Sequence, residues 1–231
     1  MNTVNLQKEM LEKVAIALGD DLLKTMVFVG GCTTGLLVTD DFTKEQIRYT
    51  DDVDLIVDIM GYAAWADLQE QLKVKGFSVS MGEGVICRMM LDNLKVDFMP
   101  LDEQALGFTN IWYVDAAETA QDYVLNDTFT IKLISPEYFI ATKLAAYLGR
   151  GNEDALSSHD IEDLLNVFDG RSSIVDEVLS ASEELKAYVS EQLSRLMADS
   201  NFEYAVQATA RNDADREQLI FERLEACINN D

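Results

Sequence analysis

The sequence predicts a protein of the α+β class, with a sheet-containing part over residues 1–134 and an α-helical part over residues 135–231. Apolar runs with the period of a strand alternate with helical patterns before Ser135, and only helical patterns follow it. Hydrophobic residues make up 48% of the 231, enough for a core. Pro and Gly number only 2 and 12, which excludes collagen-like and low-complexity chains.

The first 38 residues combine a helix, a strand and a second helix. Apolar residues recur at helical spacing over residues 4–18, which predicts a helix. The apolar run over residues 26–29 predicts a short buried strand that leads into Gly30-Gly31. A short helix is expected over residues 32–38.

A polar stretch over residues 39–51 predicts a loop, and a strand follows it. Apolar residues alternate with aspartates over residues 53–59, which is the period of a strand with one apolar face. A helical pattern over residues 62–75 stops at Gly76. Two further strands are expected over residues 77–80 and 85–91, joined by a turn over residues 81–84.

A two-residue hairpin is predicted at Asp92-Asn93, and the alternation over residues 94–99 predicts the strand that follows it. The next stretch is less regular, with a short helix expected near residues 116–124 and a strand over residues 128–134. Ser135-Pro136 is typical of a helix start, and the pattern stays helical from there to Asn229.

The charge and the cysteines limit the function classes. The chain has 18 basic and 42 acidic side chains, a formal charge of −24, and so should repel a phosphate backbone and bind DNA or RNA weakly outside a specific site. Cys32, Cys87 and Cys227 are odd in number and scattered, as free thiols in a reducing compartment are. Neither a signal peptide nor a membrane span is recognised, so a cytoplasmic protein without membrane association is expected.

An acidic cluster is predicted on the polar face of two strands. Alternation places Asp52 and Asp54 on one face, roughly 6–7 Å apart along the strand. Asp97 faces away from the apolar side of its own strand and would join them if the two strands pair. Carboxylates so placed can hold Mg²⁺ and support two-metal phosphoryl or nucleotidyl transfer. The alternative is that the short Asp-x-Asp motif is a solvated turn.

Gly30-Gly31 stands between a strand and a predicted helix, where glycine permits close backbone approach and a helix N-terminus offers N–H groups to phosphate. Thr33 would add a hydroxyl. The alternative is a purely structural turn.

A second group of polar residues lies in the helical part. Lys143 and Arg150 share one helical face, and Asp160 lies in the next helix. As functional residues, the two cations would contact triphosphate oxygens, and Asp160 would position the lysine or act as a base. The alternative is a partly buried Lys–Asp ion pair that joins two helices.

The order of these motifs resembles the nucleotidyltransferase superfamily that includes DNA polymerase β. The family patterns hG[GS], Dh[DE]h and h[DE]h read here as Val29-Gly30-Gly31, Asp52-Val53-Asp54-Leu55 and Val96-Asp97-Phe98. Within it, the chain is most similar, over about residues 25–168, to the AbiEii-type toxins of type IV toxin–antitoxin and abortive-infection systems. That likeness rests on Gly30-Gly31, Thr50–Leu55, Ser135-Pro136-Glu137, Ala141–Ala146, Arg150 and Asp160–Leu164. The chain departs from the pattern in the long interval between Gly31 and Asp52, in Cys32, and in His159, where the family commonly has Arg.

The resemblance implies a nucleotidyltransferase fold with a mixed sheet, followed by an α-helical domain. It implies an enzyme that moves a nucleotidyl group from an NTP to an RNA or protein hydroxyl, with one or two Mg²⁺ ions and a possible antitoxin partner. The implied metal ligands are Asp52, Asp54 and Asp97, which are also catalytic together with Lys143 and Asp160. The implied nucleotide-binding residues are Gly30, Gly31, Thr33, Lys143 and Arg150.

Two alternatives stay open at this point. One is a small-molecule nucleotidyltransferase of the antibiotic-modifying type, which the acidic chain favours because cationic aminoglycosides prefer acidic clefts. The other is a catalytically inactive binding module with the same fold. The sequence leaves open which NTP is used, what the acceptor is, and the oligomeric state.

Overall fold

The computed structural model describes residues 2–79, 84–150 and 154–229. The chain divides into two compact units, the first made of Met1–Thr33 and Arg48–Ser135 and the second of Thr34–Ile47 and Pro136–Asp231. The last crossing between the units lies beside the predicted boundary at Ser135. The segment Thr34–Ile47, however, belongs to the second unit, whereas the sequence placed it in the first.

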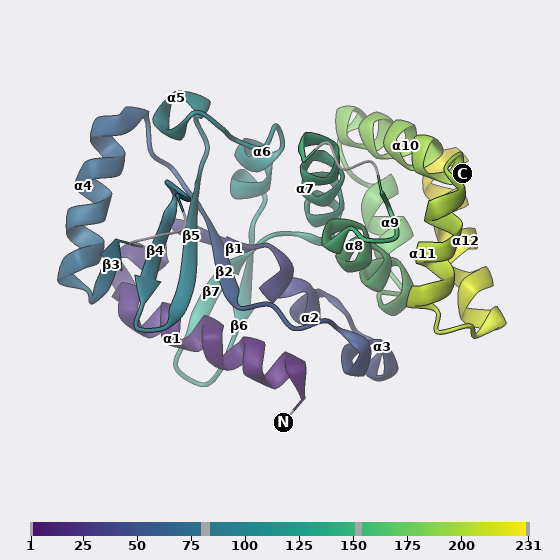
Figure 1. Cartoon of the computed structure of the whole chain (residues 1–231), viewed down its shortest axis with the longest axis horizontal. Helices are drawn as coiled ribbons and strands as arrows, with labels where there is room; N and C mark the ends of the chain where they lie inside the picture. Colours follow the sequence, from purple (N-terminus) through teal and green to yellow (C-terminus); the bar gives the residue numbers. More distant parts are fainter. Residues whose placement is uncertain (1, 80–83, 151–153, 230–231) are drawn as a thin grey trace. The chain divides into compact units, whose positions relative to one another are not determined.

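The first unit is built around one mixed sheet (Figure 1). Over the described residues, its seven strands follow the order β3-β4-β5-β2-β1-β7-β6. Neighbours pair antiparallel except β2 with β5 and β1 with β7, which are parallel. The strands are β1 (Met26–Val29), β2 (Asp52–Val57), β3 (Phe77–Val79), β4 (Arg88–Leu91), β5 (Leu94–Pro100), β6 (Gln121–Val124) and β7 (Thr130–Leu133). The predicted α+β class and mixed sheet are confirmed.

The alternation along the two central strands separates an apolar face from a polar one. Leu55 of β2 and Phe98 of β5 are partners in the parallel register, and both are fully buried. Phe98 packs against Trp65, with ring centroids 6.1 Å apart, and against Phe77 at 5.8 Å. This aromatic cluster fixes which face of the sheet is core, and so leaves Asp54 and its neighbours on the opposite face.

Helices surround the sheet within the first unit. They are α1 (Thr3–Leu23), the short 3₁₀ helix η1 (Gly31–Thr33), α4 (Gly61–Val74), α5 (Glu103–Leu106) and α6 (Tyr113–Glu118). Helix α1 runs beyond the predicted residue 18, with an irregular turn at Gly19, whose φ is 65°. Helix α4 lies beside β3 and α5, as Figure 1 shows.

Three local predictions for the first unit are corrected or lie beyond the description. Residues 121–124 form the edge strand β6 rather than the end of a helix, because their largely exposed side chains carry no apolar period. Strand β4 begins only at Arg88, since Val85 and Ile86 are exposed and Arg88 N–H bonds to the Val85 carbonyl in a turn. The predicted turn over residues 81–84 falls largely on residues 80–83, outside the described residues.

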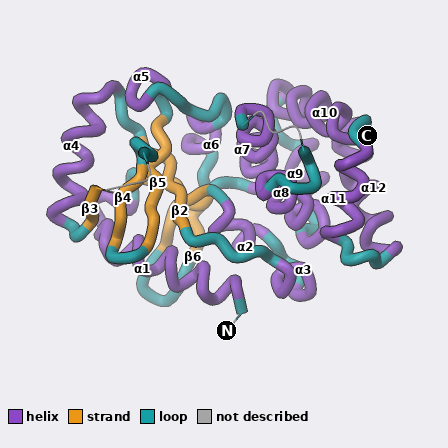
Figure 2. Tube along the Cα trace, in the orientation of Figure 1, coloured by secondary structure: helices purple, strands orange, loops and turns teal. Residues whose placement is uncertain are grey.

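The second unit contains helices and no strand among its described residues (Figure 2). The helices are α2 (Thr34–Leu37), α3 (Asp41–Gln46), α7 (Pro136–Gly149), α8 (His159–Gly170), α9 (Ile174–Leu179), α10 (Glu183–Met197), α11 (Ser200–Thr209) and α12 (Ala214–Asn229). The predicted helical texture after Ser135 is confirmed. Within the described ranges, no helix combines the length and the apolar character that crossing a membrane requires.

Helix α3 replaces part of the loop that the polar sequence over residues 39–51 predicted. Its start is capped by Asp40, whose carboxylate accepts from Thr43 N–H at 2.9 Å. The Thr43 hydroxyl bonds to Asp169 at 2.6 Å, and Arg216 reaches Asp169 at 2.6 Å and Asp40 at 3.0 Å. This partly buried polar network attaches Thr34–Ile47 to the second unit, which the local sequence pattern did not indicate.

Candidate functional site

Three aspartates converge on the polar face of β2 and β5. Asp54 and Asp97 are direct partners in the parallel register, and Asp52 lies two positions before Asp54. One carboxylate oxygen from each side chain lies within 4.8 Å of the other two. Asp97 is buried, and the other two are half-buried. The strand pairing on which the predicted cluster depended is therefore present.

Neighbouring side chains orient this aspartate cluster. The Thr50 hydroxyl, just before β2, donates to Asp52. Asp51 points elsewhere and pairs with Lys95 at 3.2 Å. Asp58 follows β2 and is exposed, so it takes no part in the cluster.

Arg88 of β4 is the site residue that sequence reasoning missed. Its Nε and Nη2 donate to the two oxygens of Asp97 at 2.7 and 2.8 Å, and its Nη2 lies 3.8 Å from Asp52. The Arg88 side chain is only 13% exposed. The hairpin at Asp92-Asn93 aligns Arg88 with Asp97 in the antiparallel register, so counting outward from the turn would have found the pair.

The cluster stays acidic after this pairing. The group brings three carboxyl side chains together with one guanidinium, so its acidic side chains outnumber its basic one. Like charges at this separation repel, and a divalent cation with oxygen ligands would remove that repulsion. The residues present therefore fit a hard divalent cation, with Arg88 as a competing cation on the same carboxylates.

Gly30 is required by its contact with Asp54. Its φ is +75°, which side-chain-bearing residues rarely adopt, and a Cβ there would lie 1.8 Å from Asp54 Oδ2. The backbone turn after β1 thus presses against the middle carboxylate of the cluster. Gly31 continues it as the first residue of η1.

The Thr33 hydroxyl is engaged within the turn. Its side chain is fully buried, and its hydroxyl donates to the Gly30 carbonyl at 2.8 Å. The hydroxyl therefore holds the turn closed instead of facing a phosphate. The predicted phosphate contact of this side chain is not supported by its position.

Cys87, next to Arg88, stays a thiol. Burial, followed by the negative charges of Asp97 and Asp54, raises the pKa of Cys87 to about 12. A protonated sulfur is neither a nucleophile nor a metal ligand at neutral pH. The chemistry of this site therefore belongs to its carboxylates.

The residues predicted from the helical part form a separate network in the second unit. Lys143 of α7 donates to Asp160 at 3.2 Å and to Asp163 at 2.6 Å, and all three side chains are at most 9% exposed. Arg150 reaches the other oxygen of Asp160 at 2.9 Å, and its own side chain is 63% exposed. This geometry is that of an ion-pair network joining α7 to α8, which was the structural alternative.

The structure thus sorts the predicted residues into two groups. Asp52, Asp54 and Asp97 meet the glycine turn in the first unit, whereas Lys143, Arg150 and Asp160 meet one another in the second. No protein-family model matches the chain, and no curated protein is similar enough to it to count as a match.

Proposed function

We propose that this protein is a Mg²⁺-dependent nucleotidyltransferase that moves a nucleotidyl group from an NTP to an acceptor hydroxyl. The observation that carries the proposal is the convergence of Asp52, Asp54 and Asp97 from adjacent strands beside the Gly30 turn. Its role as the toxin of an AbiEii-like toxin–antitoxin system, with an RNA or protein acceptor and an antitoxin partner, rests on the sequence resemblance.

In the proposed reaction, the acceptor oxygen attacks the α-phosphorus of the NTP. The bond from that phosphorus to the oxygen bridging to the β-phosphate breaks, and pyrophosphate leaves. One or two Mg²⁺ ions on the three aspartates would neutralise the phosphate charge and polarise the α-phosphate. Asp97 accepts the proton of the acceptor hydroxyl, as the resemblance implies.

Arg88 adds a condition to the role of Asp97. Both oxygens of Asp97 accept from Arg88 in the structure. Release of one of these hydrogen bonds would leave an Asp97 oxygen freer to take the proton. A cation binding to the cluster would favour that release by repelling the guanidinium, which is then available to the phosphates.

The proposed nucleotide contacts in the second unit come from the resemblance. Arg150 is the member whose side chain is largely exposed, so its guanidinium can accept a further anionic partner. Lys143 donates to two buried carboxylates. We therefore assign Lys143 and Asp160 a structural role, in which their ion pair joins α7 to α8; the catalytic role that the resemblance implies is secondary. If Arg150 binds phosphate, Arg150→Gln will raise the KM for NTP and leave kcat nearly unchanged.

A labelled-nucleotide assay tests the proposed activity. The protein is incubated with Mg²⁺ and each of the four NTPs labelled at the α-phosphate, with a panel of RNAs, proteins and cationic small molecules as acceptors. Loss of a residue that supports a metal ligand typically lowers activity about 10- to 100-fold. Asp54 is a proposed ligand itself, so Asp54→Asn should lower the rate of nucleotidyl transfer by more than that. Asp58→Asn, which changes an exposed aspartate just past β2, is the matched control and should keep full activity.

The acceptor that becomes labelled separates the proposed function from its alternative. The formal charge of −24 favours a cationic small acceptor over an RNA. Label on an aminoglycoside-like amine-rich molecule, and on no RNA or protein, would assign the antibiotic-modifying class. NTP binding without transfer to any acceptor, unchanged by Asp54→Asn, would point to the inactive binding module.

A further inference from the structure

The second unit holds a polar cavity that the proposed function does not use. It measures about 220 Å³ and lies among α3, α8 and α11. Alanine and leucine side chains make up part of its wall. Its polar lining consists of Gln46, Ser158, Glu162, Asn166, Thr209 and Arg211.

Asn166 is the residue that calls for a ligand. It is only 3% exposed, and its side-chain amide has no hydrogen-bond partner among the described residues. Ser158 and Thr209, by contrast, are engaged: the Ser158 hydroxyl accepts from Ile161 N–H, and the Thr209 hydroxyl donates to the Ala205 carbonyl at 3.0 Å. The polar atoms of its amide are not sealed from solvent but open into the cavity. A polar molecule bound there can therefore hydrogen-bond to them.

Arg211 supplies a cation to the same cavity. It follows the C-terminus of α11 with a φ of 55°, a left-handed conformation that favours glycine at such a helix end. The chain has 42 acidic side chains, yet the Arg211 guanidinium forms no ion pair with any residue in the described ranges. The Arg211 side chain is exposed and lines the cavity, so its charge is accessible to a ligand there.

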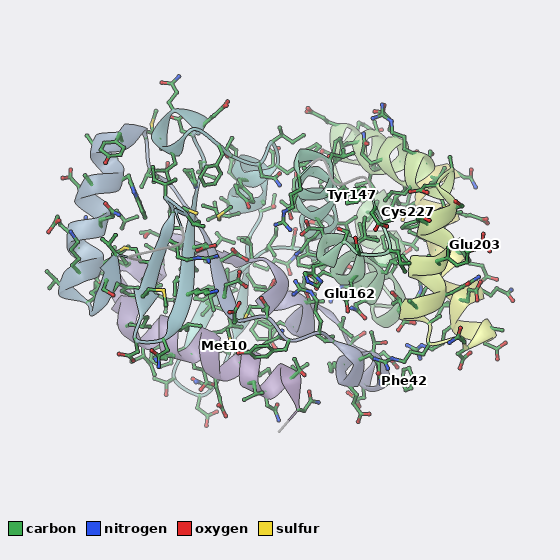
Figure 3. All side chains as sticks on the ribbon, in the orientation of Figure 1. Met10, Phe42, Tyr147, Glu162, Glu203 and Cys227 are labelled. Atoms are coloured by element: carbon green, nitrogen blue, oxygen red, sulfur yellow. The ribbon has the colours of Figure 1, made fainter. Side chains whose placement is uncertain are left out.

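Glu162 brings a negative charge to the cavity. Figure 3 labels Glu162, which lies one helical turn before Asn166 on α8. This spacing places the two residues on the same face of the helix. Its carboxylate also lies 3.4 Å from Nδ1 of the exposed His159. The cavity therefore presents one positive group, one negative group and one accessible amide.

We propose that this cavity binds a small zwitterion of the α-amino acid class. The ligand carboxylate pairs with Arg211, its ammonium group pairs with Glu162, and the Asn166 amide bonds to its polar atoms. A zwitterion has no net charge, so a chain of formal charge −24 does not repel it as it would a simple anion. The volume is below the about 300–1,000 Å³ of pockets for drug-sized molecules, which suits a ligand of this size.

Binding of individual amino acids to the full chain tests the proposal. Each of the common amino acids is titrated by calorimetry, and the tightest binder is compared with its decarboxylated amine and its N-acetylated form. We expect one amino acid, or a small group of related ones, to bind, and both derivatives to bind at least about tenfold more weakly, which corresponds to about 1.4 kcal/mol.

Variants locate the binding. Arg211→Gln and Glu162→Gln should each weaken the tightest binder at least about tenfold. Asn166→Leu should do the same, and circular dichroism checks that it still folds. The control is Arg195→Gln, which removes an exposed arginine of α10 that pairs with Glu191.

Any of four results would overturn the proposal. The first is the absence of heat and of any thermal shift with every amino acid. The second is equal binding of the amino acid, its amine and its N-acetylated form, and the third is equal binding by the wild type and Arg211→Gln. Stronger binding of inorganic phosphate than of any amino acid would also overturn it, because it would assign Arg211 to an anion.

Discussion

At the scale of single residues, the candidate site depends on two contacts that neighbouring strands impose. Gly30 lies against Asp54 so closely that no Cβ fits between them, and Arg88 is aligned with Asp97 by the hairpin. The first contact sets the position of a carboxylate. The second supplies the charge that lets three carboxylates coexist when no metal is bound.

Gly30→Ala tests the contact with Asp54. The left-handed conformation alone costs a side-chain-bearing residue about 1–2 kcal/mol. The added Cβ must in addition displace the Asp54 carboxylate, so we expect a larger loss of stability and a weaker affinity for Mn²⁺. Gly61→Ala is the matched control, because Gly61 has a φ of +78° and open space around its Cβ position. Equal losses of unfolding free energy and of metal affinity in the two variants would contradict this account.

Arg88→Gln tests the competition between the guanidinium and a cation. Removing a charged hydrogen-bond donor from a buried carboxylate should lower the unfolding free energy by about 1–3 kcal/mol. The same change should raise the Mn²⁺ affinity, so that Mn²⁺ raises the melting temperature more in the variant than in the wild type. Lys95→Gln, which removes a partner of Asp51 outside the cluster, is the control. Weaker Mn²⁺ binding in Arg88→Gln would show that Arg88 orients the carboxylates instead of competing for them.

For single residues, the sequence was informative where the two-residue alternation of a strand decides which face of the sheet a side chain occupies. Alternation alone placed Asp52, Asp54 and Asp97 on one face, and the pairing of β2 with β5 brought them together. The hydrogen bond from the Thr33 hydroxyl to the Gly30 carbonyl could not be predicted, because it depends on a tight turn that leaves no periodic pattern in the sequence.

At the scale of elements, the attachment of Thr34–Ile47 to the second unit is the main structural finding. The Gly170 carbonyl accepts from both Thr39 N–H and Asp40 N–H at 2.9 Å, and Arg171 donates to the Leu37 carbonyl at 2.7 Å. The centroid of the Phe42 ring, which Figure 3 labels, lies 4.5 Å from the guanidinium carbon of Arg216. These contacts join residues more than a hundred positions apart, and no local pattern reports them.

Gly170→Ala tests this attachment. A Cβ at Gly170 would lie 2.5 Å from Val38 Cγ1 and 2.8 Å from Thr43 Cβ. We expect a loss of about 1–3 kcal/mol, as in other overpacked sites, and faster hydrogen exchange over residues 34–47. Gly149→Ala is the control, because Gly149 also ends a helix but has nothing within 4 Å of its Cβ position, so alanine there should be neutral or stabilising by up to about 1 kcal/mol. Similar denaturation curves for the two variants would contradict the packing.

The cap of α3 should depend on pH. The Thr43 N–H, then its hydroxyl, then Arg216 lower the pKa of Asp40 from its usual 3.8. A lowered folded-state pKa means that the stabilisation is complete above pH 3.8 and is lost as the pH falls through the lower folded value. Hydrogen exchange in α3 should therefore accelerate there, while α10, capped by the hydroxyl of Ser182, changes less. Asp40→Asn should abolish this difference between the two helices, and its persistence in that variant would contradict the assignment.

Sequence patterns recovered the elements whose buried face has a clear period. They failed for α3, which depends on the cap at Asp40 and on partners in α8 and α12, and for β6, an exposed edge strand whose only described pairing is with β7. In both elements the contacts are distant in sequence, so tertiary structure decides them.

At the scale of the whole molecule, one chain forms two units, and the second takes a segment from within the first. The change from mixed strand and helix patterns to helical patterns alone at Ser135 lies beside the last boundary between the units. The inserted segment Thr34–Ile47, in contrast, depends on polar contacts of Asp169 and Arg216. The chain has 42 acidic side chains against 18 basic ones. In the part of the chain that the structure describes, Asp52, Asp54 and Asp97 bring carboxylate oxygens within 4.8 Å of one another. That cluster is the centre of the proposed function.

The most direct measurement is the anomalous scattering of Mn²⁺ in crystals grown with a non-hydrolysable NTP. The account predicts Mn²⁺ bound by oxygens of Asp52 and Asp54, close to Asp97, with the nucleotide phosphates on the same ion and Arg88 turned away from Asp97. A nucleotide bound elsewhere, or crystals in which Arg88 still holds Asp97 and no Mn²⁺ lies among the three aspartates, would contradict it.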